Sequence, residues 1–176
     1  MSSPDRRADA DAVRRGRTVG VDVGRARVGL AATDPDALIA TPLRTLRRDA
    51  KKGSDLRLAV QEILDADAVA VYVGLPLNLQ GRWTPSTEDA VDYARRLADE
   101  VAAAGSDAAV RLVDERMSTV SAQRQLQASG RTVKDSRAVI DQAAAVAILQ
   151  AAVDTQRRTG VWAGDPVSDL TEESTR

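Results

Sequence analysis

Hydrophobic and polar residues alternate between residues 17 and 34, where the sequence runs RTVGVDVGRARVGLAATD. Two runs rich in β-branched residues are joined around Gly24–Ala26, and this period-two pattern on both sides of a glycine predicts a β-hairpin. The pattern also predicts a third, edge-like strand over Thr41–Arg48. The fold is therefore expected to begin with three strands.

After residue 53 the pattern changes to helices that alternate with strands. Apolar residues at helical spacing predict one helix that begins at Ser54, its expected N-cap, and another over Ser86–Ala104. Short continuous apolar runs at Val69–Val73 and Ala109–Val113 are typical of buried parallel strands. Two last helices are predicted near Thr119–Ala128 and over Lys134–Gln156.

An antiparallel meander followed by βα units makes a mixed five-stranded sheet with helices on both faces. This α/β order of elements is that of the ribonuclease H-like fold. The 176 residues suffice for one domain, which we expect at residues 17–158. The polar, aperiodic residues 1–16 and 159–176 are predicted to be disordered tails.

Composition restricts the possible chemistry. Because the chain contains no His and no Cys, imidazole and thiolate ligands, Cys nucleophiles and disulfides are excluded. Catalysis must then use carboxylates, hydroxyls, Lys or a hard metal. An aromatic content of 2% argues against base stacking on an aromatic platform. Without cysteines, a long apolar run or a secretory signal, the protein is expected to be cytoplasmic and to contact no membrane.

The net charge of −1 provides no overall attraction for a polyanion, so nucleic-acid binding would depend on a local basic patch. Only Lys51, Lys52 and Lys134 are lysines, and arginine, the better bidentate phosphate ligand, supplies the remaining positive charge. The alternative to phosphate binding, for any single arginine, is that it forms an ion pair on the solvated surface.

Two carboxylates stand on or beside predicted strands. Asp22 lies between Val21 and Val23, where an isolated charge is too costly unless it is paired, protonated or bound to a cation. Glu115 follows the strand sequence VRLV, at the sheet edge where active sites of open α/β sheets collect. The structural alternative for Asp22 is an aspartate of the hairpin turn beside Gly24. The alternative for Glu115 is an ordinary charged residue on the loop between strand and helix.

A third carboxylate, Asp141, lies in the helical sequence AVIDQAAAVAILQAAV, which is apolar on almost every side. At helical spacing it shares a face with residues such as Ala145 and Ile148. Small alanines would let this helix lie close to the sheet and bring Asp141 beside Asp22. A local pair with Arg137 is the structural alternative.

Clustered carboxylates bind hard divalent cations such as Mg²⁺ or Mn²⁺. Two such ions about 4 Å apart can activate a water and stabilise the leaving oxygen in phosphodiester hydrolysis. This chemistry needs neither His nor Cys. We therefore predict Asp22, Glu115 and Asp141 as the catalytic and metal-binding residues.

Four motifs resemble those of the YqgF/RuvX family and cover about residues 17–153: VGVDVGRARVGLAATD, VYVGLPLNLQGR, VDERMST and KDSRAVIDQAAAVAILQ. The resemblance implies a ribonuclease H-like fold related to the RuvC resolvases and a cytoplasmic nuclease that matures the 5′ end of pre-16S rRNA. Members have also been proposed as Holliday junction resolvases that act on branched DNA. The family's three acidic positions fall on Asp22, Glu115 and Asp141.

One departure from the RuvC resolvases is that Gly74-Leu75-Pro76 stands where an acidic residue is expected, so Glu115 must supply that ligand from the next strand. The loop GLPLNLQGR would lie at the same sheet edge and could bind substrate. The alternative is that it is only a rigid Gly-Pro turn that connects a strand to a helix. The residues predicted to contact nucleic acid are Arg25, Arg27, Asn78, Arg82 and Arg116.

Two other functions compete with the nuclease. Asp-Val-Gly resembles the phosphate loop of actin-like ATPases, but those proteins need two lobes and 176 residues leave room for one. A noncatalytic RNA-binding ribosome-assembly factor is the third possibility, and the retained acids argue against it. A monomer or a homodimer fits either function.

Overall fold

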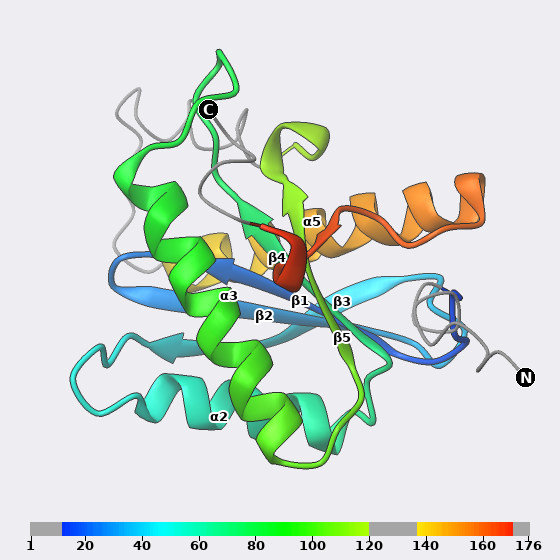
Figure 1. Cartoon of the computed structure of the whole chain (residues 1–176), viewed down its shortest axis with the longest axis horizontal. Coiled ribbons are helices and arrows are strands. Elements are labelled where there is room, and N and C mark those ends of the chain that lie inside the picture. The colour runs from blue at the N-terminus through cyan, green and yellow to red at the C-terminus, as the bar shows by residue number, and fades with distance from the viewer. Residues whose placement is uncertain (1–11, 120–136, 171–176) are drawn as a thin grey trace, which may run out of the picture.

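A computed structural model describes residues 12–119 and 137–170, with the backbone alone at residues 137–141. The described part contains a six-stranded sheet in the order β3-β2-β1-β4-β5-β6 (Figure 1). The strands are β1 (Thr18–Val23), β2 (Arg27–Thr33), β3 (Ala40–Arg47), β4 (Ala70–Leu75), β5 (Ala109–Asp114) and β6 (Asp165–Pro166). The helices are α2 (Ser54–Asp65), α3 (Pro85–Ala103) and α5 (Arg137–Thr159), with 3-10 turns η1 (Glu115–Met117) and η3 (Val167–Asp169).

The predicted mixed sheet is confirmed. β1, β2 and β3 form an antiparallel meander, and β4 and β5 are parallel to β1. The sheet has one strand more than the five predicted, because β6 pairs antiparallel with β5 at Arg111 and Leu112. From residue 120 on, the helix predicted near Thr119–Ala128 lies outside the described residues.

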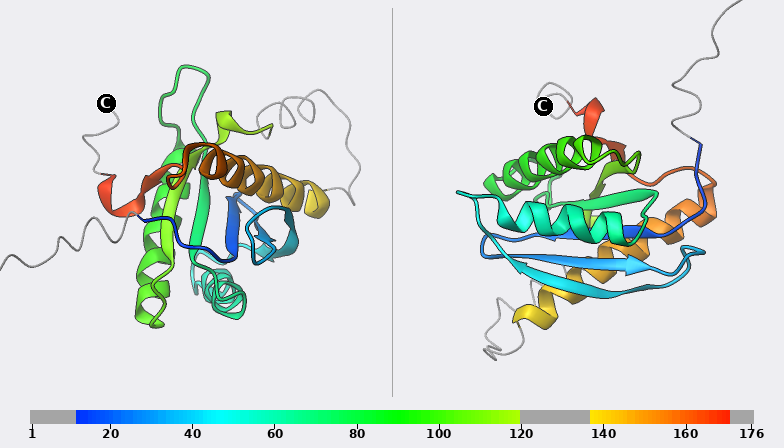
Figure 2. Two further views of the ribbon diagram at one scale, coloured as in Figure 1. Left: turned by 90° about the vertical axis from the view of Figure 1, so that its right-hand side faces the viewer. Right: turned by 90° about the horizontal axis from the view of Figure 1, so that it is seen from below.

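α2 and α3 cover one face of the sheet and α5 covers the other, as Figure 1 and Figure 2 show. Along β1, Val19 and Val21 pack in the core beneath α2 and α3, whereas Gly20 faces α5. A Cβ atom at Gly20 would lie 2.6 Å from Leu149 Cβ and 2.9 Å from the Ala145 carbonyl oxygen. The missing side chain lets α5 lie close to the sheet. Within the described ranges no helix is long and apolar enough to cross a membrane.

The start of α2 differs from its prediction by one residue. The N-cap is Gly53, whose φ of 65° is in the left-handed region that favours glycine. Ser54 is the first helical residue, and its hydroxyl donates to Asp49 Oδ2 at 2.6 Å. Asp49 also accepts from the backbone N–H of Lys52, so an aspartate before the helix organises the turn that Ser54 was predicted to cap.

The C-terminal segment is packed rather than a tail where the structure describes it. Trp162 and Ala163 are 6% and 5% exposed. The Arg111 guanidinium donates to the carbonyl oxygens of Ala163 and Gly164 at 2.7 and 2.6 Å. The prediction of a disordered tail from residue 159 is therefore wrong for residues 160–170.

The described N-terminal residues also contact the domain. Arg14 donates to the Asp107 carboxylate at 2.6 Å and to the carbonyl oxygen of Val69 at 3.1 Å. This anchors part of the segment that was predicted to be a tail ending at residue 16. Residues 1–11 and 171–176 lie outside the described part of the chain.

Candidate active site

Asp22 lies near the carboxyl end of β1, with 3% of its surface exposed. Because side chains alternate along a strand, Asp22 faces the same side as Gly20, which is the side covered by α5. The fold thus buries the Asp22 carboxylate between the sheet and a helix. The apolar neighbours Val21 and Val23 predicted such an interior position.

Glu115 directly follows β5 and is 5% exposed. Its Oε1 atom lies over Gly74 of β4, where a Cβ atom would be 2.9 Å from it. Val21 pairs with Val73 in the ladder between β1 and β4, which sets Asp22 beside Gly74 at the next position. Asp22 and the Glu115 carboxylate therefore lie on the same face of the sheet, around the glycine that stands where an acid was expected.

Asp141 belongs to the first turns of α5, and its side chain lies outside the described residues. One turn further along α5, Ala145 lies over Gly20. In Figure 1 α5 runs opposite to β1, so its amino-terminal turns extend toward the end of β1 that carries Asp22. The backbone is compatible with the predicted approach of Asp141 to Asp22, and the role of its carboxylate stays a prediction.

The donor set fits a hard divalent cation. Asp22 and Glu115 offer carboxylate oxygens, the ligands that Mg²⁺ and Mn²⁺ prefer, and both lie almost out of contact with solvent. Among the side chains that the structure describes, no group of three or more acidic residues is arranged to hold a metal. The third predicted ligand, Asp141, falls outside that set.

A partly buried ionic network holds the turn between β1 and β2. The Arg48 guanidinium donates to the carbonyl oxygen of Gly24 at 3.0 Å and makes two hydrogen bonds, at 2.9 and 3.0 Å, to the Asp89 carboxylate. Its Nε lies 3.5 Å from Asp55, and it stacks 5.2 Å from the centre of the Tyr93 ring. Sequence reasoning missed this network, because its contacts join residues that are far apart in the sequence, such as Arg48 and Asp89, which are 41 positions apart.

The loop after β4 lies against η1. A Cβ atom at Gly81 would be 3.1 Å from Nη1 of Arg116, so the loop backbone approaches that guanidinium closely. Asn78 Oδ1 accepts hydrogen bonds from the backbone N–H groups of Gln80 and Arg82, both at 2.9 Å. Three residues predicted to contact nucleic acid, at positions 78, 82 and 116, are thus brought together, and the Asn78 oxygen also braces its own loop.

Arg116 is paired with its neighbour Asp114. Its Nη2 atom lies 2.6 Å from Asp114 Oδ2, and its Nε donates to the same carboxylate at 3.0 Å. Partial burial alone would raise the pKa of Asp114, but the hydrogen bonds and charge of Arg116 outweigh it and hold that pKa below its usual value. The pair therefore orients the guanidinium of a side chain that is 40% exposed.

The two remaining predicted contacts lie at the β1–β2 turn. Arg25 is exposed in the turn, and Arg27, half-buried, begins β2. Both follow Asp22 closely in the chain, so they stand at the same end of β1 as the carboxylate. Their contact with nucleic acid stays a prediction.

Comparison with known proteins identifies the family. The RuvX family profile, described as Holliday junction resolvase, matches residues 16–155. A protein of Clavibacter sepedonicus named "Putative pre-16S rRNA nuclease" is 51% identical over 148 residues, covering 84% of this chain and 89% of the relative. A Mycobacterium ulcerans protein of the same name is 51% identical over 161 residues, covering 89% and 91%.

Among solved structures, the fold is similar to that of Thermus thermophilus RuvC in complex with a Holliday junction substrate. The TM-score is 0.55 at 16% identity, covering 84% of this chain and 98% of RuvC. This likeness confirms the ribonuclease H-like fold. Together with the sequence matches over most of the chain, it leads to one conclusion: the chain belongs to the RuvX family of nucleases.

Proposed function

We propose that this protein is a divalent-metal-dependent nuclease that processes the 5′ end of pre-16S rRNA. The observation that carries the proposal is the placement of two nearly buried carboxylates, Asp22 and Glu115, on one face of the sheet around Gly74. The names of relatives at 51% identity favour the ribosomal RNA precursor as substrate.

Asp22, Glu115 and Asp141 would hold the cation, which we take to be Mg²⁺ or Mn²⁺. Asp22 comes from within a strand, Glu115 from the turn after β5, and Asp141 from the first turns of α5. When bound, such a cation supplies the Lewis acidity that phosphodiester hydrolysis needs. Ligands on three separate elements keep their oxygens in place because the sheet and helix are fixed by their own packing.

The positive side chains around this edge would bind and orient the RNA backbone. Arg116 is held in position by Asp114, and its side chain is 40% exposed. Arg25 lies in the turn after β1, and Arg82 in the loop against η1. With a net charge of −1, attraction of the polyanion depends on this local group rather than on the whole molecule.

A cleavage assay tests the proposal. Purified protein is incubated with labelled 16S rRNA precursor in Mg²⁺, Mn²⁺ or chelator, together with Asp22→Asn, Glu115→Gln and Asp141→Asn. We expect cleavage by the wild type with either metal, loss of cleavage in chelator, and a loss of about a hundredfold or more in each variant. Asp99→Asn, an exposed change on α3, is the control and should cut like the wild type. Full activity of Asp22→Asn would refute the assignment.

Branched DNA is the second candidate substrate, because the matching family profile is described as Holliday junction resolvase. A four-way DNA junction assayed in parallel separates the two substrates. An intact RNA precursor and an intact junction, with RNA binding retained in chelator, would instead support a noncatalytic assembly factor. ATP turnover is expected to be absent.

A further inference from the structure

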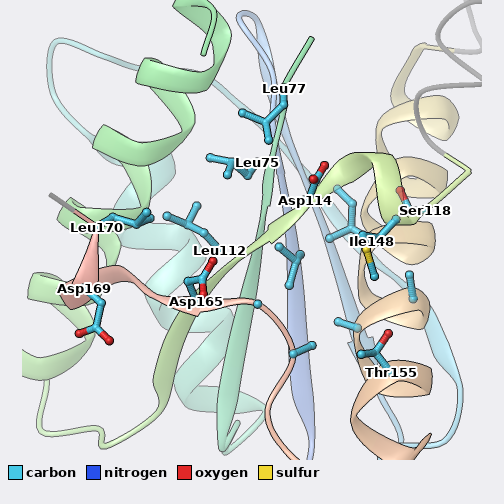
Figure 3. Close-up of a pocket in the computed structure, with 16 residues that line it drawn as sticks. Leu75, Leu77, Leu112, Asp114, Ser118, Ile148, Thr155, Asp165, Asp169 and Leu170 are labelled. Carbon is cyan, nitrogen blue, oxygen red and sulfur yellow. The ribbon is translucent and has the colours of Figure 1, made fainter. Parts of the chain in front are cut away.

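A cavity of about 470 Å³ lies beside the proposed active site. In Figure 3, Ile148 and Thr155 project from α5 on one side of it, and Leu112 and Leu170 lie on the other. Its volume falls within the range of about 300–1,000 Å³ that is typical of small-molecule sites. None of the functions considered so far uses this space.

The cavity exists because β6 covers only part of β5. The pairing with β6 involves Arg111 and Leu112, so Val113 and Asp114 extend beyond it toward the carboxyl end of the sheet. The C-terminal segment, through Gly164 and Leu170, closes the opposite wall. The result is a hollow between α5 and that segment, open toward the sheet edge.

The cavity adjoins the catalytic carboxylates. Ile148 lines it, and the Cδ1 atom of Ile148 would lie 2.6 Å from a Cβ atom at Gly74, the residue under Glu115 Oε1. Asp114, the residue before Glu115, also lines the cavity. A group in the cavity would therefore lie near a phosphodiester that is held at these carboxylates.

The chemistry of the lining selects the kind of group. Apolar side chains, chiefly leucine and alanine, form most of the walls, while the carboxylates of Asp114, Asp165 and Asp169 are the charged groups among the lining residues. Carboxylates repel a phosphate but accept hydrogen bonds from the N–H groups of a base edge. Arg116 is bound to the lining residue Asp114, so its guanidinium could hold a phosphate beside the cavity.

We propose that this cavity receives one unstacked nucleobase of the RNA, next to the cleaved phosphodiester. The inference rests on the proposed nuclease function and specifies it: the substrate would have an unpaired nucleotide at the cleavage site, its base in the cavity and its phosphate at Arg116. The walls would hold the base by apolar contact and by carboxylate acceptors, since the residues that line the cavity in the described structure include no aromatic ring.

The probe for the test is an RNA duplex with a single bulged nucleotide, prepared with a normal base, with an abasic site, or with a fluorescent adenine analogue that brightens when it leaves the base stack. We expect the abasic duplex to bind about tenfold more weakly than the normal one, as loss of one buried base predicts. The analogue should brighten on binding. Binding is measured in chelator, so the result does not depend on cleavage.

Ala151→Leu fills the cavity, and Ala103→Leu makes the same change at the exposed end of α3 as its matched control. We expect Ala151→Leu to bind the normal duplex as weakly as the abasic one and to leave abasic binding unchanged, while Ala103→Leu behaves like the wild type. Equal wild-type affinity for normal and abasic RNA, or an analogue that stays dim, would overturn the inference and leave the cavity to another ligand.

The two proposals fail in different ways. If wild-type protein cuts RNA in Mg²⁺ but its affinity for the duplex does not change when the bulged base is removed, the nuclease proposal stands and the base site is refuted. If the base contributes to binding but no RNA is cut with either metal, the base site stands and the nuclease proposal is refuted.

Discussion

Replacing Gly74 by alanine is the most direct test of the candidate site. The added methyl carbon would lie 2.9 Å from Glu115 Oε1 and 2.6 Å from Ile148 Cδ1, and ordinary contacts begin at 3.4 Å. Two groups must therefore move. Ile148 Cδ1 is the far end of a flexible side chain, whereas Glu115 Oε1 is a proposed metal ligand.

The size of the effect follows from these distances. Overpacking of a core by one methyl typically costs about 1–3 kcal/mol of unfolding free energy. The Glu115 oxygen must retreat by about 0.5 Å, and a displacement of about 1 Å at an active site can cost about a hundredfold in rate, so we expect roughly a tenfold loss of activity. Stability and activity should thus both fall, for separate reasons.

Two further variants separate those reasons. Ile148→Val removes the Cδ1 atom, so Gly74→Ala/Ile148→Val should regain part of the lost stability while its activity stays low. Gly105→Ala is the control for instability alone, because its φ of 83° makes alanine cost about 1 kcal/mol although no atom lies within 4 Å. It should cut RNA at the wild-type rate.

The assay combines urea unfolding with cleavage rates measured in Mg²⁺ well below the transition. If Gly74→Ala loses stability but cuts RNA as fast as the wild type, the position of the Glu115 carboxylate does not matter for catalysis. If the double variant Gly74→Ala/Ile148→Val regained full activity, the reasoning would also be contradicted, because the loss of activity would then come from the packing of Ile148 and not from the Glu115 carboxylate.

Three other outcomes are expected. Arg48→Met should lower the free energy of unfolding by about 3 kcal/mol, because Asp55, which is 3% exposed, loses its cation. Asp89→Asn should lower it by about 1 kcal/mol or less, because the Asp89 side chain is 37% exposed. Urea unfolding measures both losses, and equal losses would contradict the reasoning. Trp162→Ala should cost about 3 kcal/mol or more if the C-terminal segment is part of the core, and a loss near zero would contradict its packing. Mn²⁺ should raise the melting temperature of the wild type but not of Asp22→Asn or Glu115→Gln, and an equal rise in all three would exclude these ligands.

The order of strands and helices could be predicted because each element has a local pattern. The hairpin is an example, since alternation on both sides of Gly24 specifies two strands and their joint. The C-terminal segment has no such pattern. It is ordered by contacts from distant residues, such as the hydrogen bonds of Arg111 to Ala163 and Gly164, which polar composition does not indicate. The signal that could have indicated its burial is Trp162, one of two tryptophans in the chain.

The candidate site was predictable residue by residue but not as an arrangement. Asp22 stands out by its apolar neighbours and is buried as expected. The space that Gly74 leaves for the Glu115 carboxylate appears only when β1, β4 and β5 are in register. The hydrogen bonds and ion pairs of Arg48 could not be predicted from the sequence for the same reason: their partners come from separate elements.

Asp114 and Glu115 connect the two proposed sites. Asp114 ends β5 and lines the cavity with its carboxylate on Arg116, while the turn η1 carries Glu115 back over Gly74 on the α5 face. Asp114 also accepts the backbone N–H of Arg116 and so caps that turn. A base that contacts Asp114 would therefore act on the same short turn that positions Glu115. Binding of the unpaired nucleotide and placement of the carboxylate would be coupled through three consecutive residues, which gives a physical reason for cleavage to depend on an unpaired base.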